Sequence, residues 1–120
     1  MREATIDVLG VGHAIVDVLA NTTDAFLNEH GIAKGAMTLV DGFRAETLGR
    51  TMKNTVEASG GSAANTMVGI ASFGGSAGFV GKVNDDRLGQ VFIEDIHKSG
   101  VRFEGEPAPG AVATASCHIL

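Results

Sequence analysis

The sequence predicts an α/β domain in which helices cover a mostly parallel β-sheet. Short apolar segments typical of strands alternate along the chain with longer segments whose apolar residues recur every three or four positions, as in helices. The composition is that of a globular protein, because 44% of the 120 residues are hydrophobic and 19% are charged. A chain of this length is long enough for one domain with a core.

The first third of the chain predicts two extended segments and a short helix. Residues 6–11 are mainly apolar and are typical of a buried strand, and residues 15–20 predict a second extended segment. Thr22 or Thr23 can cap the helix that follows, and Gly31 can end it.

A further strand is predicted at residues 36–40. Asp41 is then expected to cap a weaker helix that covers residues 43–53.

Two adjacent glycines, Gly60 and Gly61, lie between an apolar segment and a helical pattern that begins near Ser62. Paired glycines permit backbone angles closed to other residues and let a ligand approach the main chain. Ser62 is a candidate N-cap, and Asn65 falls in the first helical turn, where its amide can both donate and accept hydrogen bonds. This arrangement suits a polyhydroxylated ligand better than a metal, although a tight strand-to-helix turn without a ligand explains the glycines equally well.

The second half of the chain continues the alternation. It predicts a buried strand at 77–80, a turn at 84–86 whose Asp86 caps a helix that ends at Gly100, a loop at 104–110 and a strand at 111–120. The extended segments at 15–20, 36–40 and 111–120 exceed what the main sheet needs, so they are expected to form a small second sheet. The phenylalanines expected in the core are Phe26, Phe73, Phe79 and Phe92.

Charge and cysteine content exclude several classes of function. The net charge is −5 and no cluster of Lys and Arg exists, which argues against nucleic acid or an anionic membrane as a partner. The single cysteine, Cys117, cannot form an internal disulfide, and no signal peptide or membrane-spanning run is visible, so a cytoplasmic protein is expected. The histidines lack the spacing of metal ligands, and no metal site is expected.

Two glycine motifs fail as nucleotide-binding fingerprints. Gly10-Val-Gly12 is followed by Ile15 where a dinucleotide fingerprint requires glycine. Gly81-Lys82 is followed by Val83 where a phosphate-binding P-loop requires Ser or Thr.

Three segments together resemble the N-terminal portion of the PfkB, or ribokinase-like, family of sugar and nucleoside kinases. GVGHAIVD at 10–17 resembles its first strand, GGSAAN at 60–65 its first signature, and GKVNDDRLG at 81–89 its G-x-V-G-x-D-x-x-G element. Met67 replaces an expected small residue and Asn84 replaces a usual glycine. The Gly-Gly-Ser turn is similar to that of adenosine-kinase-like members.

The resemblance implies a ribokinase-like, doubly wound sheet with a small β-sheet lid, of which residues 1–120 are the N-terminal portion of a single domain. The lid strands are expected near 15–20, 36–40 and 111–120. The resemblance also implies transfer of the γ-phosphate of ATP, with Mg²⁺, to a primary hydroxyl of a sugar or nucleoside. The family's Gly-Ala-Gly-Asp motif, which carries the catalytic base, is absent, so we expect the base and most of the ATP site beyond Leu120 and an inactive 120-residue chain.

The resemblance assigns substrate binding to a few residues: Asp17, Gly60, Gly61, Ser62 and Asn65. A carboxylate accepts hydrogen bonds from two vicinal hydroxyls, and a charge at position 17 among apolar neighbours needs a partner. Capping alone explains Ser62, and a structural cap explains Asp86. His13 and Cys117 are possible members of the substrate pocket, although Cys117 is by default a small buried hydrophobe.

The alternatives are a sugar- or nucleoside-binding module without catalysis and a purely structural domain. The latter leaves Asp17 and the glycine pair unexplained. The protein is expected to be a monomer or a homodimer formed through lid strands.

Overall fold

A computed structural model describes residues 5–110 and 112–120. The elements of this part alternate much as the sequence predicts. In chain order they are β1 (Val8–Val11), β2 (Ile15–Leu19), α1 (Asp24–Glu29), α2 (Gly42–Thr51), β3 (Val56–Gly60), α3 (Ser62–Ser72), β4 (Ala77–Val80), α4 (Arg87–Lys98) and β5 (Ala115–Ile119).

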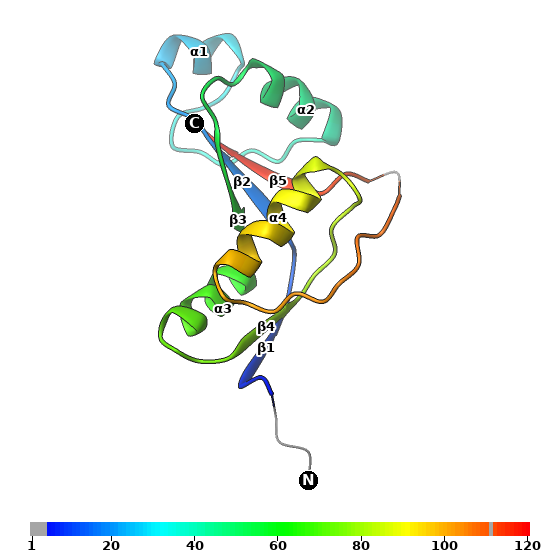
Figure 1. The fold of residues 1–120 in the computed structure, drawn as a ribbon. Helices are drawn as coiled ribbons and strands as arrows, with labels where there is room; N and C mark the ends of the chain where they lie inside the picture. Colours follow the sequence, from blue (N-terminus) through cyan, green and yellow to red (C-terminus); the bar gives the residue numbers. More distant parts are fainter. Residues whose placement is uncertain (1–4, 111) are drawn as a thin grey trace.

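The strands form two sheets that lie one beyond the other along an elongated molecule of 60 × 32 × 22 Å (Figure 1). β1 and β4 pair in parallel. β2 is the centre of a three-stranded sheet, with β3 antiparallel on one side and β5 parallel on the other. The expected α/β fold with two sheets is therefore present, although among the described residues the second sheet has three strands and the β1–β4 sheet has two.

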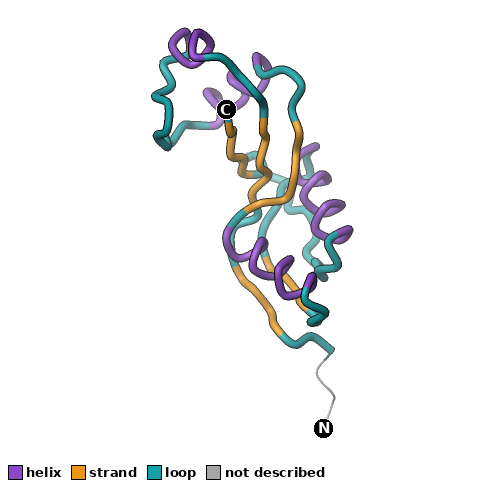
Figure 2. Tube along the Cα trace, turned by 90° about the vertical axis from the view of Figure 1, so that its left-hand side faces the viewer, coloured by secondary structure: helices purple, strands orange, loops and turns teal. Residues whose placement is uncertain are grey.

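Helices α3 and α4 connect the two sheets. α3 packs against β1 and β4, and α4 runs alongside β3 and β2 (Figure 2). The aromatic rings of Phe79 on β4, Phe92 on α4 and Phe103 after α4 meet with centroids 5.6–6.1 Å apart. Phe79 and Phe92 are buried as predicted, whereas the prediction for Phe73 is wrong. Phe73 is the C-cap of α3 and is 93% exposed.

Three of the predicted helix N-caps are present, because capping depends on nearby residues. The side chains of Thr23, Asp41 and Asp86 accept hydrogen bonds from the backbone N–H groups of Phe26, Arg44 and Gly89. Gly31 has a positive φ of 63° just after α1, where such a residue ends a helix.

Strand β1 is less buried than its sequence predicts. Leu9 and Val11 are 58% and 74% exposed. A side chain at Gly10 would point at Met67 of α3, so Leu9 and Val11 face the opposite side of the sheet, where Val80 is also half exposed. The prediction fails because helices cover one face of the β1–β4 pair and the described residues leave the other open.

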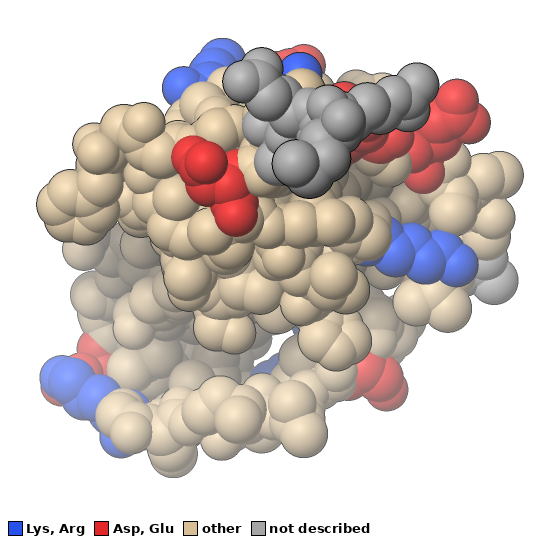
Figure 3. Space-filling view, turned by 90° about the horizontal axis from the view of Figure 1, so that it is seen from below, with Lys and Arg blue, Asp and Glu red and all other residues tan. Residues whose placement is uncertain are grey.

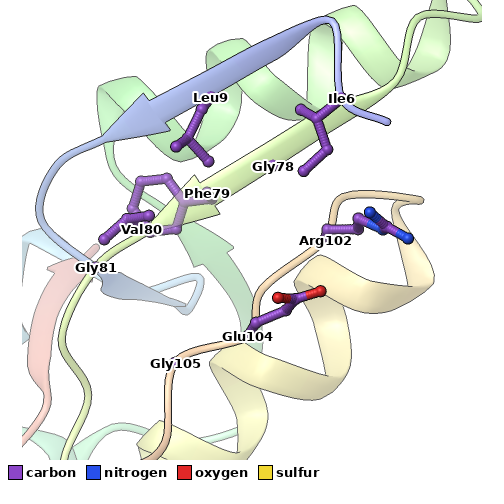
Figure 4. A pocket seen from close by; sticks show the side chains of 9 residues that line it. All are labelled: Ile6, Leu9, Gly78, Phe79, Val80, Gly81, Arg102, Glu104 and Gly105. Carbon is purple, nitrogen blue, oxygen red and sulfur yellow. The ribbon is translucent and has the colours of Figure 1, made fainter. Parts of the chain in front are cut away.

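This open face borders a cavity of about 410 Å³, which Ile6, Leu9, Phe79 and Arg102 help to line (Figure 4). At the end of the molecule where β1 and β4 lie, the visible surface is mainly uncharged, and acidic and basic side chains are scattered over it (Figure 3).

Residues 36–40 do not form the expected strand. β3 and β5 flank the central strand β2, and residues 36–40 do not extend the sheet beyond either of these outer strands. Met37 and Leu39 are instead 82% and 89% exposed. At the end of the chain, β5 begins at Ala115 rather than near residue 111, which itself lies outside the described residues. None of the described helices is long and apolar enough to cross a bilayer.

Candidate functional site

Strand β2 places Asp17 on the outer face of the three-stranded sheet. Val16 and Val18 alternate with it and point inward, where they are 0% and 5% exposed. The side chain of Asp17 therefore points to the opposite face, and this residue is half-buried. No described residue donates a hydrogen bond to its carboxylate, which leaves both oxygens available as acceptors for a ligand.

Gly60 lies directly beside this carboxylate. β3 pairs with β2 so that Gly60 is opposite Ile15, and a Cβ atom at Gly60 would be 2.5 Å from Asp17 Oδ2. The Asp17 carboxylate occupies the space that a side chain at position 60 would need. Gly60 therefore permits this orientation of Asp17.

Gly61 is required by both its conformation and its surroundings. Its φ of 92° lies in the region that favours glycine, and a Cβ atom would be 2.7 Å from the His13 carbonyl oxygen. Gly61 also occupies the N-cap of α3, and no side chain caps this helix. The first backbone N–H groups of α3 consequently have no side chain as a capping partner. These groups lie beside the sheet that carries Asp17.

The expectation that Ser62 is the N-cap is wrong. Because Gly61, with its positive φ, occupies the N-cap position, Ser62 is the first helical residue, and its side chain is exposed. Asn65 lies in the first turn as predicted, with its backbone N–H donating to the Gly61 carbonyl at 2.9 Å. Its side chain is exposed.

His13 and Cys117 lie on either side of this arrangement. His13 is exposed in the connection from β1 to β2, and its carbonyl contacts Gly61. Cys117 pairs in register with Asp17 and shares its face. The default expectation that Cys117 is buried is wrong, because Ser116 and His118 point inward instead. Burial lowers the pKa of His118 below its ordinary value of 6.5.

The structure thus brings Asp17, Gly60, Cys117 and the start of α3 to one region, where the three-stranded sheet meets the body of the molecule. Within this region Gly60 is buried, Asp17 is half-buried and Cys117 is exposed. The 410 Å³ cavity lies at β1 and β4, and a hollow of about 680 Å³ lies between α1, α2 and the chain end, so neither contains Asp17. We define the site by its polar groups rather than by those hollows. Across the described residues, no three His, Cys, Asp or Glu side chains gather as metal ligands.

Sequence analysis missed the contribution of β3. Its length and pairing bring Gly60 beside Asp17, but the sequence indicated only a short apolar segment before the two glycines. A weak alternation of Val56, Ala58 and Gly60 against Glu57 and Ser59 was the available signal.

A family model described as pfkB family carbohydrate kinase matches residues 9–120. The chain therefore belongs to the pfkB family of carbohydrate kinases, as its three motifs predicted.

Two solved structures share the ribokinase-like fold closely. Adenosine kinase from Sinorhizobium meliloti is 51% identical with a TM-score of 0.81, and the match covers 96% of this chain and 35% of that one. A probable sugar kinase from Rhizobium etli is 44% identical with a TM-score of 0.80, over 94% of this chain and 34% of that one. The chain spans about a third of the length of either protein, and the predicted fold class is confirmed.

A curated relative, fructokinase-2 from Oryza sativa, is 44% identical over 50 residues. This match covers 42% of the chain and 15% of the fructokinase.

A prediction follows from the contact between Gly60 and Asp17. We expect Gly60→Ala to displace the Asp17 carboxylate, since the flexible carboxylate yields to a methyl group more easily than the backbone does. Substrate affinity of the whole kinase should fall roughly tenfold, the loss expected for one hydrogen bond to a charged group. Calorimetric titration measures the affinity, and a thermal melt should show that the protein stays folded.

Gly69→Ala is the matched control. Gly69 lies within α3, and a Cβ atom there would meet no atom within 4 Å. The control should bind substrate normally and melt at the same or a slightly higher temperature. Normal affinity in Gly60→Ala would show that the orientation of Asp17 does not matter for binding.

Proposed function

We propose that this chain is the substrate-binding part of a kinase that transfers the γ-phosphate of ATP to a primary hydroxyl of a sugar or nucleoside. The observation that carries the proposal is the Asp17 carboxylate beside Gly60, on the outer face of the three-stranded sheet, in a chain of the pfkB family. The rival proposal is a binding module of the same specificity without catalysis.

The geometry suits a ligand with several hydroxyl groups. The two oxygens of Asp17 can accept hydrogen bonds from vicinal hydroxyls, and Asn65 can donate and accept from the start of α3. The glycine pair allows the ligand to approach the backbone. A binding contact of this kind orients the acceptor hydroxyl, which is a large part of what phosphoryl transfer requires.

The described residues do not fit an ATP–magnesium site. They offer neither a cluster of carboxylates nor a phosphate-binding loop. We therefore place the catalytic base and most of the ATP and Mg²⁺ site outside these 120 residues and assign the residues of this chain no step in the chemistry.

The named relatives support both substrate classes. The Sinorhizobium meliloti structure is an adenosine kinase, whereas the Rhizobium etli structure and the Oryza sativa relative are named as a probable sugar kinase and a fructokinase. We favour an adenosine-kinase-like protein, because the 51% identity to the Sinorhizobium protein extends over 96% of this chain.

The proposed partner is a small molecule, and the proposed location is the cytoplasm, where a lone exposed cysteine such as Cys117 stays reduced. The assembly is a monomer or a homodimer formed through the three-stranded sheet.

Two experiments separate the kinase from the binding module. The coding sequence after Leu120 should encode a Gly-Ala-Gly-Asp motif. Purified full-length protein should release ADP from ATP with at least one member of a panel of nucleosides, pentoses and hexoses. Absence of the motif and of turnover, together with measurable binding of a panel member, would favour the module.

A further inference from the structure

The segment 81–89 resembles a family element, yet none of its residues belongs to the candidate site. In the structure, Asn84 and Asp86 of this segment form hydrogen bonds with Thr114. Thr114, which directly precedes β5, is 5% exposed and is surrounded by the turn that begins α4.

Thr114 makes three hydrogen bonds with this turn. Its hydroxyl donates to Asp86 Oδ1 at 2.7 Å and accepts from the Asn84 backbone N–H at 2.9 Å. Its backbone N–H donates to Asp86 Oδ2 at 2.8 Å. Asp86 Oδ1 also accepts from the Gly89 N–H and so caps α4 at the same time. One carboxylate thus joins the helix to the start of β5.

The ionisation of Asp86 agrees with this role. Burial alone would raise the pKa of Asp86, but hydrogen bonds from Thr114 and Gly89 outweigh it and leave the pKa below 3.8. The carboxylate is therefore charged at neutral pH and is a strong acceptor.

The turn is built around this contact. A Cβ atom at Gly89 would lie 2.1 Å from the Asn84 carbonyl oxygen and 3.2 Å from Thr114 Oγ1, so only glycine allows the close approach. The Asn84 side chain donates to the carbonyls of Gly110 and Val112 and holds the segment that leads to Thr114.

Helix α4 also holds β3, at the other edge of the three-stranded sheet. Arg87 makes two hydrogen bonds to the Glu57 carboxylate at 2.6 and 2.7 Å, and the hydrogen bond from Arg87 lowers the pKa of Glu57. Asp95 accepts the backbone N–H of Ser59 at 2.7 Å, one residue before Gly60. Both outer strands are therefore tied to one helix, and β2 with Asp17 lies between them.

We infer that the start of α4 is the joint that positions the three-stranded sheet for substrate binding, with Asp86 and Thr114 as positioning residues. The inference rests on the proposed function. Ala115, next to Thr114, pairs with Ile15, and Cys117 pairs with Asp17, so a shift of β5 moves the Asp17 carboxylate relative to the start of α3. Neither positioning residue is part of the binding surface.

The test compares Thr114→Val with Thr114→Ser in the full-length protein. Valine has nearly the shape of threonine but can neither donate to Asp86 nor accept from Asn84, whereas serine keeps both hydrogen bonds. We expect Thr114→Val to raise the KM for the sugar or nucleoside roughly tenfold and to leave the KM for ATP unchanged. Thr114→Ser should behave as wild type.

A second pair covers the case in which Thr114→Val does not fold. Asp86→Asn places an amide where the Thr114 N–H needs an acceptor, and Asp41→Asn is its control, because Asp41 also caps a helix and its side chain accepts from the backbone N–H of Arg44 in that helix. Only Asp86→Asn should raise the substrate KM.

Hydrogen exchange tests the joint independently of activity. Exchange should accelerate in residues 15–19 and 115–119 of Thr114→Val and Asp86→Asn, with residues 8–11 and 77–80 unchanged. Unaltered exchange in the three-stranded sheet would overturn the inference, and so would accelerated exchange with an unchanged substrate KM in an active enzyme. A wild type without turnover on any panel member would instead count against the proposed function.

Discussion

Residues 1–120, produced on their own, are expected to associate in solution and to release no ADP from ATP. The open face of β1 and β4 exposes Leu9, Val11 and Val80, and β1 has an unpaired edge in the described chain. Apolar patches and free strand edges of this kind promote association. Large apolar side chains are also exposed elsewhere on the molecule, and they include Met37, Leu39, Phe43, Phe73 and Val112.

The absence of turnover has a separate cause. Phosphoryl transfer depends on positioning the nucleotide and stabilising charge on its γ-phosphate. Among the described residues, no three His, Cys, Asp or Glu side chains gather where they could hold a metal ion for the nucleotide. Light scattering gives the size of the purified chain, and an ADP-release assay with the best substrate of the whole enzyme gives its activity. A compact monomer with measurable turnover would contradict both expectations. It would show that the active site lies within these 120 residues.

Asp17→Asn should weaken substrate binding by roughly tenfold or more while the protein stays folded. The substitution keeps the size of the side chain and removes its charge, and a hydrogen bond to a charged group contributes about 1.5–3 kcal/mol. Folding should suffer little, because no described residue depends on the carboxylate as a hydrogen-bond acceptor. Calorimetric titration of the whole kinase with its substrate measures the loss.

Asp24→Asn is the control for the change of charge. Asp24 forms an exposed ion pair with Lys34, and such surface pairs contribute little to stability. Its substrate affinity should equal that of wild type. Equal affinities of Asp17→Asn and wild type would remove Asp17 from the site.

The features that the sequence predicted well depend on residues close together in the chain. The caps at Thr23, Asp41 and Asp86 form within one helical turn, and Gly61 has the positive φ that the glycine pair was expected to permit. The three motifs also led to the family and its fold.

The features that it predicted poorly depend on which distant segments meet. The apolar pattern of residues 36–40 favours a strand, but these residues pair with neither outer strand, β3 or β5, of the three-stranded sheet. The pattern of β1 indicates burial, yet nothing in it specifies whether both faces are covered. A single buried threonine such as Thr114 carries no signal of its contact with Asp86, 28 residues away.

The most direct test of the account is a crystal structure of the whole kinase with its sugar or nucleoside bound. Vicinal hydroxyls of the substrate should lie about 2.5–3.0 Å from the Asp17 carboxylate oxygens, next to Gly60 and the start of α3. A substrate bound elsewhere, with Asp17 facing only water, would contradict the account.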